Sequence, residues 1–353
     1  MPVRLAPASV AILLGLLTAS ARAADSAGAV VERTYDVRDL AIPIPDFNDA
    51  PELGIEKPQP PAPAGADASD AAKSREAQTK ELITLLREVV PPADLGDAHL
   101  VAERDGQLYV RGSAEAHGAV AKVLDELRRR RMGQVTLEAR LVQPDAKTLE
   151  KIAADEPVLA RKLHLASFHG GDRAGTELSA AEVEALRRIA GTVSAPRMTV
   201  YTGQNAYVLV ATSRAYVASV VRKTGPDGAE AFEGVIGTVA AGVVLSGRAT
   251  LAGDGKSAAL GARVSLTTLH GMTDQPAPGV PRRDDLKVQV PDFETRTFDV
   301  NAVAPDGGYL LFGVTASKRP NPAAGAPGAA EQGPLYLVVH TTLVPPRIPE
   351  GVH

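Results

Sequence analysis

The stretch V-S-A-P-R-M-T-V-Y-T-G-Q-N-A-Y-V-L-V, residues 193–210, is the best guide to the fold of this chain. β-Branched and aromatic residues lie on both sides of Thr202-Gly203, which indicates two strands joined by a tight turn. Pro196 suits the first position of a strand, where its missing N–H leaves no ladder hydrogen bond unmade. The stretch holds no nucleophile motif, metal-ligand set or phosphate-binding loop. It therefore predicts architecture and not chemistry.

Composition places the chain among globular proteins whose core is built from Val, Leu and Ala. The chain has 353 residues, of which 44% are hydrophobic and only 4% aromatic, and it has no Trp. This length allows two domains and a sizeable core. The formal net charge of -4 gives no reason to expect a nucleic-acid partner.

The N-terminus predicts export. Arg4 supplies a positive charge, residues 8–19 are apolar, and Ala21-Arg22-Ala23 has the A-x-A cleavage pattern, so we expect residues 1–23 to be a signal peptide. The chain has no Cys, so the sequence predicts neither disulfides nor a lipid anchor on Cys. No later run of apolar residues is long enough to predict a membrane-spanning helix.

The part before residue 134 predicts a strand-containing segment, a linker and a small α+β domain. Residues 24–55 include the alternating run R-T-Y-D-V-R-D-L, and the Pro/Ala-rich residues 56–73 predict an extended linker. Residues 74–133 predict a helix, a hairpin with an Asp-Gly turn and a second helix, and such a unit must lay its helices on one face of a small sheet. The two helices have apolar residues at i, i+3, i+4 and i+7 or close to it: Leu82, Leu85, Leu86 and Val89, then Val120, Val123, Leu124 and Leu127.

Residues 134–353 predict a β-rich core of antiparallel strands with a few short helices. Residues 134–143 alternate, and Ser179 with Glu182 forms a capping-box pattern that starts a helix. Asp254-Gly255 predicts a hairpin turn, as does the P-D-G-G sequence that begins at residue 305. Two Pro-rich segments, 271–285 and 315–334, predict a loop and a flexible insertion.

Several of these stretches resemble, in the same order, the core of bacterial secretins of type II and III secretion systems. Ser194-Ala195-Pro196-Arg197 and the T-x-x-x-G-Q-x-A pattern after it match the hairpin of that family. Q-V-T-L-E-A-R-L-V from Gln134, V-A-P-D-G-G-Y-L-L-F-G from residue 303 and the last strand, 335–344, are similar to further motifs of the family. The Y-D-V-R-D-L run resembles the opening that precedes its periplasmic domains.

The resemblance implies an α+β fold, with a small ring-building domain at 74–133 followed by a secretin-like core at 134–353. It implies a homo-oligomeric ring that takes part in protein secretion across the outer membrane, within a type II/III secretion or pilus-assembly type apparatus. The expected partners are identical copies and other secretion-apparatus proteins, and the expected location is the outer membrane or the periplasm. Where the family carries its gate segment, this chain has the insertion 315–334. This departure keeps an alternative open, a soluble periplasmic scaffold or binding protein that retains the core without forming a pore.

No residue is predicted to be catalytic, cofactor-binding or metal-binding, and we expect no enzyme activity. His164 and His169 lack the i, i+4 spacing of a helical metal site, although Asp172 follows them. The chain has no G-x-S-x-G elbow, Walker sequence or G-x-G-x-x-G loop. A hydrolase would need a cleft that gathers perturbed titratable groups. The four arginines 128–131 allow two interpretations: a solvated helix end that favours the helix dipole, and contact with an acidic neighbour.

Overall fold

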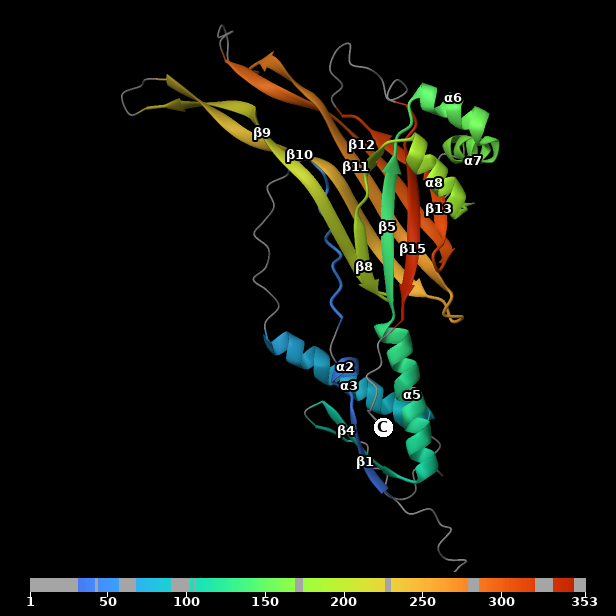
Figure 1. Cartoon of the computed structure of the whole chain (residues 1–353). Helices are drawn as coiled ribbons and strands as arrows, with labels where there is room; N and C mark the ends of the chain where they lie inside the picture. Colours follow the sequence, from blue (N-terminus) through green and yellow to red (C-terminus); the bar gives the residue numbers. More distant parts are fainter. Residues whose placement is uncertain are drawn as a thin grey trace, which may run out of the picture. The chain divides into compact units, whose positions relative to one another are not determined.

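The computed structural model describes residues 31–41, 44–56, 68–89, 102–104, 106–168, 174–225, 230–278, 286–320 and 333–345. The chain forms two compact units (Figure 1), a smaller one that takes its described residues from 1–43 and 64–129 and a larger one from 44–63 and 130–346. The expected signal peptide, residues 1–23, lies outside the described residues. In the described ranges, no helix combines the length and the apolar character needed to cross a membrane.

The smaller unit is a three-stranded antiparallel sheet with helices. Its elements are β1 (Val31–Asp36), α2 (Arg38–Ala41), α3 (Ala68–Val89), β3 (Ala102–Arg104), β4 (Gln107–Gly112) and α5 (Ala114–Met132). The strand order is β1-β4-β3, and β1 pairs with β4 from Val31 opposite Gly112 to Asp36 opposite Gln107. The N-terminal segment thus supplies a strand to this unit, which the sequence did not indicate because the partner strand lies about seventy residues away.

The core of the smaller unit follows the predicted helix stripes. Leu82, Leu86, Val120 and Leu124 are buried together with Leu108 of β4. The spacing therefore identified the buried face of α5 correctly, and on α3 it identified Leu82 and Leu86, whereas Leu85 is not part of this core and the side chain of Val89 lies outside the described residues. The predicted linker 56–73 overlaps α3, which begins at Ala68, and its middle lies outside the described residues.

Arg128 differs from the expectation of a solvated arginine run. Its side chain is buried, and Nε donates to Asp39 Oδ2 at 2.8 Å while Nη2 donates to the carbonyl of Asp36 at 2.6 Å. Arg129 instead pairs with Glu126 at 2.8 Å on the exposed side of α5. The helical period places about one residue in four on the buried face, so consecutive arginines on α5 lie in different environments.

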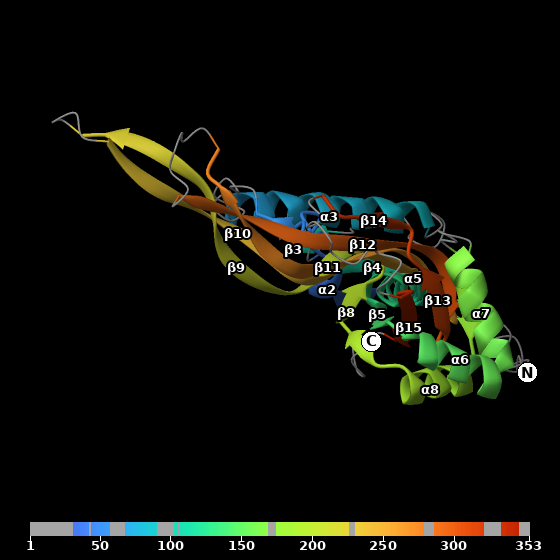
Figure 2. The same cartoon turned by 90° about the horizontal axis from the view of Figure 1, so that it is seen from above.

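The larger unit has three layers, with two sheets face to face and helices on the second sheet (Figures 1 and 2). The first sheet has the order β14-β12-β11-β10-β2 with β9 also on β10, and the second has the order β6-β13-β15-β5-β7 with β8 also on β5. Its elements are β2 (Gly54–Ile55), β5 (Gln134–Val142), α6 (Ala146–Asp155), α7 (Pro157–Phe168), β6 (Thr176–Leu178), α8 (Ala180–Ile189), β7 (Thr192–Ser194), β8 (Arg197–Tyr201), β9 (Asn205–Thr224), β10 (Glu230–Leu251), β11 (Ser257–Pro276), β12 (Lys287–Pro305), β13 (Tyr309–Gly313), β14 (Ala316–Lys318) and β15 (Tyr336–Val344). The α+β class and the antiparallel strands confirm the predicted fold class.

Two apolar layers hold the larger unit together. The main core lies between the sheets and includes the alternating residues of β5, namely Val135, Leu137, Ala139 and Leu141, with Phe298 of β12. A second layer lies between the other face of the second sheet and α6, α7 and α8. Alternation along β5 therefore predicted which side chains face the first sheet. The capping box at Ser179 is present and starts α8.

The strands of the first sheet are longer than predicted. β9, β10, β11 and β12 have 20, 22, 20 and 19 residues, against about 5–6 for an average strand. The predicted loop 271–285 is in part strand, because β11 continues to Pro276 and pairs with β12 past a register shift at Leu269/Gly271. The predicted insertion 315–334 contains β14, which pairs with β12.

Candidate functional site

The candidate site is the first sheet of the larger unit, because its two outer edges are long and largely open. We use "outer edge" for the side of β9 away from β10 and the side of β12 away from β11. In the ranges that the structure describes, no strand pairs with the outer edge of β9, and only the three residues of β14 pair with that of β12. Open strand edges are templates for pairing with another chain.

The direction of the backbone groups on these edges follows from a few hydrogen bonds. The N–H of Asn205 donates to Asp46 Oδ1 at 2.7 Å, and its carbonyl accepts from the N–H of Phe47 at 2.9 Å. Odd-numbered residues from Asn205 to Ala215 therefore direct their N–H and C=O groups outward, since this direction alternates along a strand. On β12 the carbonyl of Thr297 accepts from the N–H of Thr315 at 2.8 Å, so odd-numbered residues face outward there too.

Proline on β12 agrees with this assignment. Pro291 lies inside the strand at an odd position, where its missing N–H would point away from β11. Proline is confined to such positions on edge strands. The sequence therefore carried a signal for the edge character of β12 that length and periodicity alone do not give.

The sheet forks at Gly242 of β10. The β10–β11 ladder begins with Gly242 opposite Thr267, and before Gly242 the strand pairs with β9 on one side and with the short β2 on the other. Figure 1 shows the β9–β10 and β11–β12 hairpins running to separate tips. Near the fork, Tyr216 and Val239 of one hairpin pack with Phe293 of the other. Burial raises the pKa of Tyr216.

Glycine is required at the fork. Gly242 has φ +152°, and a Cβ there would lie 2.1 Å from the carbonyl oxygen of Val210. Gly247 has φ +154°, and its Cβ would lie 2.5 Å from the Cα of Ala262. Only a residue without a side chain allows β9 and β11 to approach β10 this closely from its two edges.

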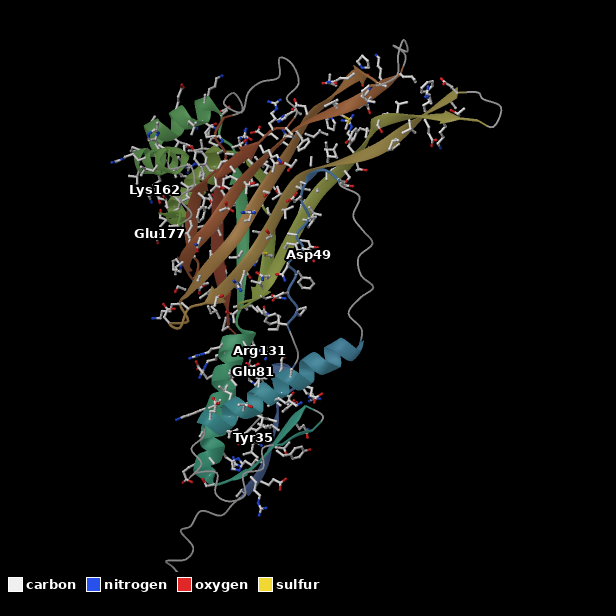
Figure 3. All side chains as sticks on the ribbon, turned by 180° about the vertical axis from the view of Figure 1, so that it is seen from behind. Tyr35, Asp49, Glu81, Arg131, Lys162 and Glu177 are labelled. Carbon is white, nitrogen blue, oxygen red and sulfur yellow. The ribbon has the colours of Figure 1, made fainter. Side chains whose placement is uncertain are left out.

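A segment from the N-terminal part of the chain, residues 44–56, crosses the outside of the β9–β10 hairpin. We call it the strap. It is fastened at Asn205 as described, at β10 through β2, and at Ser213, whose hydroxyl donates to Glu56 at 3.0 Å. A groove of about 1020 Å³ lies between the strap and the hairpin, and it is lined by acidic Asp49 and Glu52 as well as apolar side chains. Figure 3 shows Asp49 on the strap beside β9 and β10.

The far half of the β9–β10 hairpin carries an apolar band. On one face of β10, Phe232 and Ile236 alternate, and Val220 and Val217 lie on β9 beside or opposite them. Ile236 is 63% exposed. The tip beyond this band is charged, with ion pairs Arg222–Glu230 and Lys223–Glu233.

A buried ionic cluster lies where β14 meets β12. Arg319 donates two hydrogen bonds to Asp292, at 2.9 and 2.7 Å, and Ser317 donates to Glu294 at 2.6 Å. Arg296 Nε donates to Glu294 at 3.0 Å. Asp292, Glu294 and Arg296 are all buried. Burial alone would raise the pKa of Glu294, but the hydrogen bonds from Arg296 and Ser317 outweigh it and lower that pKa.

The described residues offer little that resembles an enzyme site. A pocket of about 310 Å³ between α6, α7 and β15 is lined mostly by apolar side chains, with His164, Ser167 and Tyr336. Ser167 and Tyr336 share a hydrogen bond of 2.7 Å, and burial raises the pKa of Tyr336. Lys162 of α7 donates to the carbonyl of Glu177 of β6 at 2.9 Å (Figure 3), which holds the helix to the strand.

No three potential metal ligands gather anywhere in the described part of the chain. His169 and Asp172, considered with His164 as a metal set, lie outside the described residues. The sequence named no catalytic, cofactor-binding or metal residue, and this stays a prediction.

Comparison with known proteins gives a likeness of structure. No protein-family model matches the chain, and no curated protein matches its sequence significantly. Solved structures that resemble it include several secretins. One is the GspD secretin in a pilotin–secretin AspS–GspD complex from enterotoxigenic Escherichia coli, with 14% identity, 95% of this chain and 78% of that chain covered, and a TM-score of 0.30.

Two further solved structures are similar to this chain. The type II secretion system secretin GspD of Escherichia coli has 13% identity, covers 95% of this chain and 67% of its own, and has a TM-score of 0.34. The Salmonella type III secretion injectisome basal body with InvG, PrgH and PrgK has 12% identity, 96% and 64% coverage and a TM-score of 0.28. Because these TM-scores are low, the role proposed below is argued from the strand edges and sheet faces of the chain itself.

Proposed function

We propose that the chain is a secretin-like, ring-forming structural component of a type II/III secretion or pilus-assembly type apparatus. The observation that carries this proposal is the pair of outer edges on β9 and β12. They are of nearly equal length, 20 and 19 residues, and they belong to the same sheet. The contact between copies would be main-chain pairing, so the function would be architectural.

The direction of the strands supports the proposal. β9, β10, β11 and β12 are antiparallel in succession, so β9 and β12 run in opposite directions. A second copy that places its β9 beside β12 therefore pairs antiparallel, as every pair within the sheet already does. This contact joins two different surfaces, and a head-to-tail contact of that kind closes into a ring when its rotation permits.

The apolar band supports an association with the outer membrane. Val217, Val220, Phe232 and Ile236 lie on one face of the hairpin, and none of them belongs to the core between the two sheets in the described part of the chain, while Ile236 also lines the groove beside the strap. The charged tip beyond the band would remain among lipid headgroups or in water, because burial of unneutralised charge in hydrocarbon is costly. Export, an outer-membrane or periplasmic location and contact with other secretion-apparatus proteins are parts of this proposal.

One observation favours the alternative of a soluble periplasmic scaffold. β14 occupies Thr295, Arg296 and Thr297 in the middle of the β12 edge. A neighbour cannot pair with the whole edge while β14 is there. A chain that keeps β14 in place would retain the core and remain without a ring.

A substitution on the edge of β9 tests the proposal. Ala215 is exposed, and its N–H points outward by the alternation described above. Ala215→Pro removes that donor while keeping the bonds to β10, and Ala215→Ser is the matched control. We expect sedimentation in detergent to show large assemblies for the wild type and the Ser variant and their loss in the Pro variant. Assemblies of unchanged size and yield in the Pro variant would contradict edge pairing.

A further inference from the structure

β14 lies on the surface that the proposed ring would need. It pairs antiparallel with β12 at Thr295–Lys318, Arg296–Ser317 and Thr297–Ala316. The next residue toward the N-terminus, Thr315, adds two bonds to the carbonyl of Thr297, from its N–H and from its hydroxyl, both at 2.8 Å. The outward backbone groups at the centre of the β12 edge are thus engaged by the same chain.

Side chains hold β14 more firmly than three strand residues could. Arg319 follows β14 directly, and its guanidinium grips the carboxylate of Asp292 with two hydrogen bonds. Its side chain is 12% exposed and that of Asp292 is 5% exposed, so the pair is largely shielded from water. Ser317, within β14, donates to the buried Glu294. Planar two-bond pairs of this kind are stronger and more directional than a single ionic contact.

The other end of the same insertion is fastened to the same cluster. Arg296 donates to the carbonyl of Gly333 at 3.4 Å and to Glu294 at 3.0 Å. Gly333 precedes β15, whereas Ser317 and Arg319 lie 16 and 14 residues earlier in the chain. The acidic and basic residues of β12 therefore contact both ends of the segment between β13 and β15, next to Val314 and Leu335, which pack in the main apolar core.

We propose that β14 is an edge guard, an internal strand that covers the β12 edge in the single chain and leaves when the β9 edge of a second copy arrives. This inference rests on the proposed ring function and adds to it the control of when the ring closes. The occupant of the uncovered edge is the outer edge of β9 from another copy of this chain.

A second copy could form more main-chain contacts with the β12 edge than β14 does, which favours such an exchange. β14 offers three paired residues, whereas β9 has 20 residues and runs in the right direction, with contacts from the strap at Asn205 and from Gln289 at the N–H of Val217. A neighbour could not add its full ladder while β14 occupies the centre. The ionic cluster would delay replacement until the neighbour is in place, because an isolated chain with a bare edge would invite incorrect pairing.

A covalent lock on β14 tests the guard. Thr297→Cys with Ala316→Cys places two thiols on directly opposed residues, whose Cα separation of about 4.5–5.5 Å suits a disulfide. The chain has no native Cys to interfere. The matched control is Ala259→Cys with Val303→Cys, which joins directly opposed residues of β11 and β12, two strands that never separate in this account. Each variant is imaged for rings when oxidised and when reduced.

We expect the oxidised guard-locked variant to give about tenfold fewer rings, or none, and the reduced form to recover them, while the control forms rings in both states. Rings in equal yield from the oxidised and reduced guard-locked variant would overturn the guard and leave the ring itself intact. Absence of rings from every variant and from the wild type would overturn the proposed ring function, and the guard with it.

A release variant gives the opposite readout. Arg319→Gln removes the two-bond contact to Asp292 and should raise the rate of ring formation by about tenfold or more, since 1.4 kcal/mol already corresponds to that factor. Arg263→Gln, which loses an exposed ion pair to Asp299 on the same sheet, should leave the rate unchanged. Slower or unchanged assembly of the Arg319 variant would contradict the guard.

Discussion

Gly242 of β10 lies opposite Thr267 of β11, and this pair is the last one before the two long hairpins separate. On its other side Gly242 lies opposite Ala211 of β9. The absence of a side chain at Gly242 allows β9 to approach β10 closely at the fork, because a Cβ there would meet Val210 and Ala211 of β9.

Gly242→Ala should lower the free energy of unfolding of the larger unit by about 1–3 kcal/mol or more, because the new Cβ would strike the carbonyl of Val210 and the backbone conformation is strained for other residues. Gly261→Ala on β11 is the control, since nothing lies within 4 Å of a Cβ there. Urea unfolding of both variants measures the difference. Equal loss, or none, would contradict the assigned role of Gly242.

Tyr35 should fasten β1 into the smaller unit. Its hydroxyl lies 2.9 Å from His117 Nδ1, while His117 Nε2 lies 2.9 Å from the carbonyl of Val31, and both side chains are buried. Tyr35→Phe leaves a buried ring nitrogen unpaired, so we expect a loss of about 1–3 kcal/mol in the stability of this unit. Tyr109→Phe, which removes an exposed hydroxyl contact, should cost much less. A smaller effect at Tyr35 than at Tyr109 would contradict the account.

Acid should weaken the ionic cluster beneath β14. The pKa of Glu294 is lowered in the folded chain, so its ionised form is favoured by folding. That stability is fully present above the ordinary glutamate pKa of about 4.3 and is lost as the pH falls through the lowered value. We expect Glu294→Gln to flatten the fall in stability between about pH 5 and pH 2, measured by urea unfolding at each pH. An identical pH profile in the variant and the wild type would count against this source of stability.

The apolar band should govern the membrane association. Ile236→Ser removes its most exposed side chain, and the expected result is release of more protein from outer membranes by an alkaline wash. Val158→Ser on α7 removes an equally apolar side chain that is 54% exposed on the helical side and should change nothing. Equal retention of both variants on the membranes would show that the apolar band does not contribute to membrane binding.

The sequence predicted the layers of the fold better than its edges. Alternation at Val135 to Leu141 and helical spacing at Leu82 and Leu86 depend on burial within one element, and the structure confirms both. The predicted loop 271–285 was wrong in its first part, because β11 runs to Pro276 and a proline fits at the end of a strand.

Long-range pairings were beyond the sequence. β1 finds β4 and the strap finds β9 across gaps of many residues, and no local pattern specifies such partners. The pair Asp292–Arg319 likewise joins residues that are 27 apart, each of which looks like an ordinary surface charge in the sequence. The fold buries both side chains, and this buried ion pair holds β14 against β12.

The central claim is that copies of this chain join β9 to β12 and close into rings. Negative-stain imaging of the protein without residues 1–23, in mild detergent and in detergent-free buffer, tests it most directly. The account predicts rings of uniform diameter in detergent, and their loss in Ala215→Pro but not in Ala215→Ser. Uniform small particles for the wild type in both preparations would contradict the claim and favour the soluble scaffold.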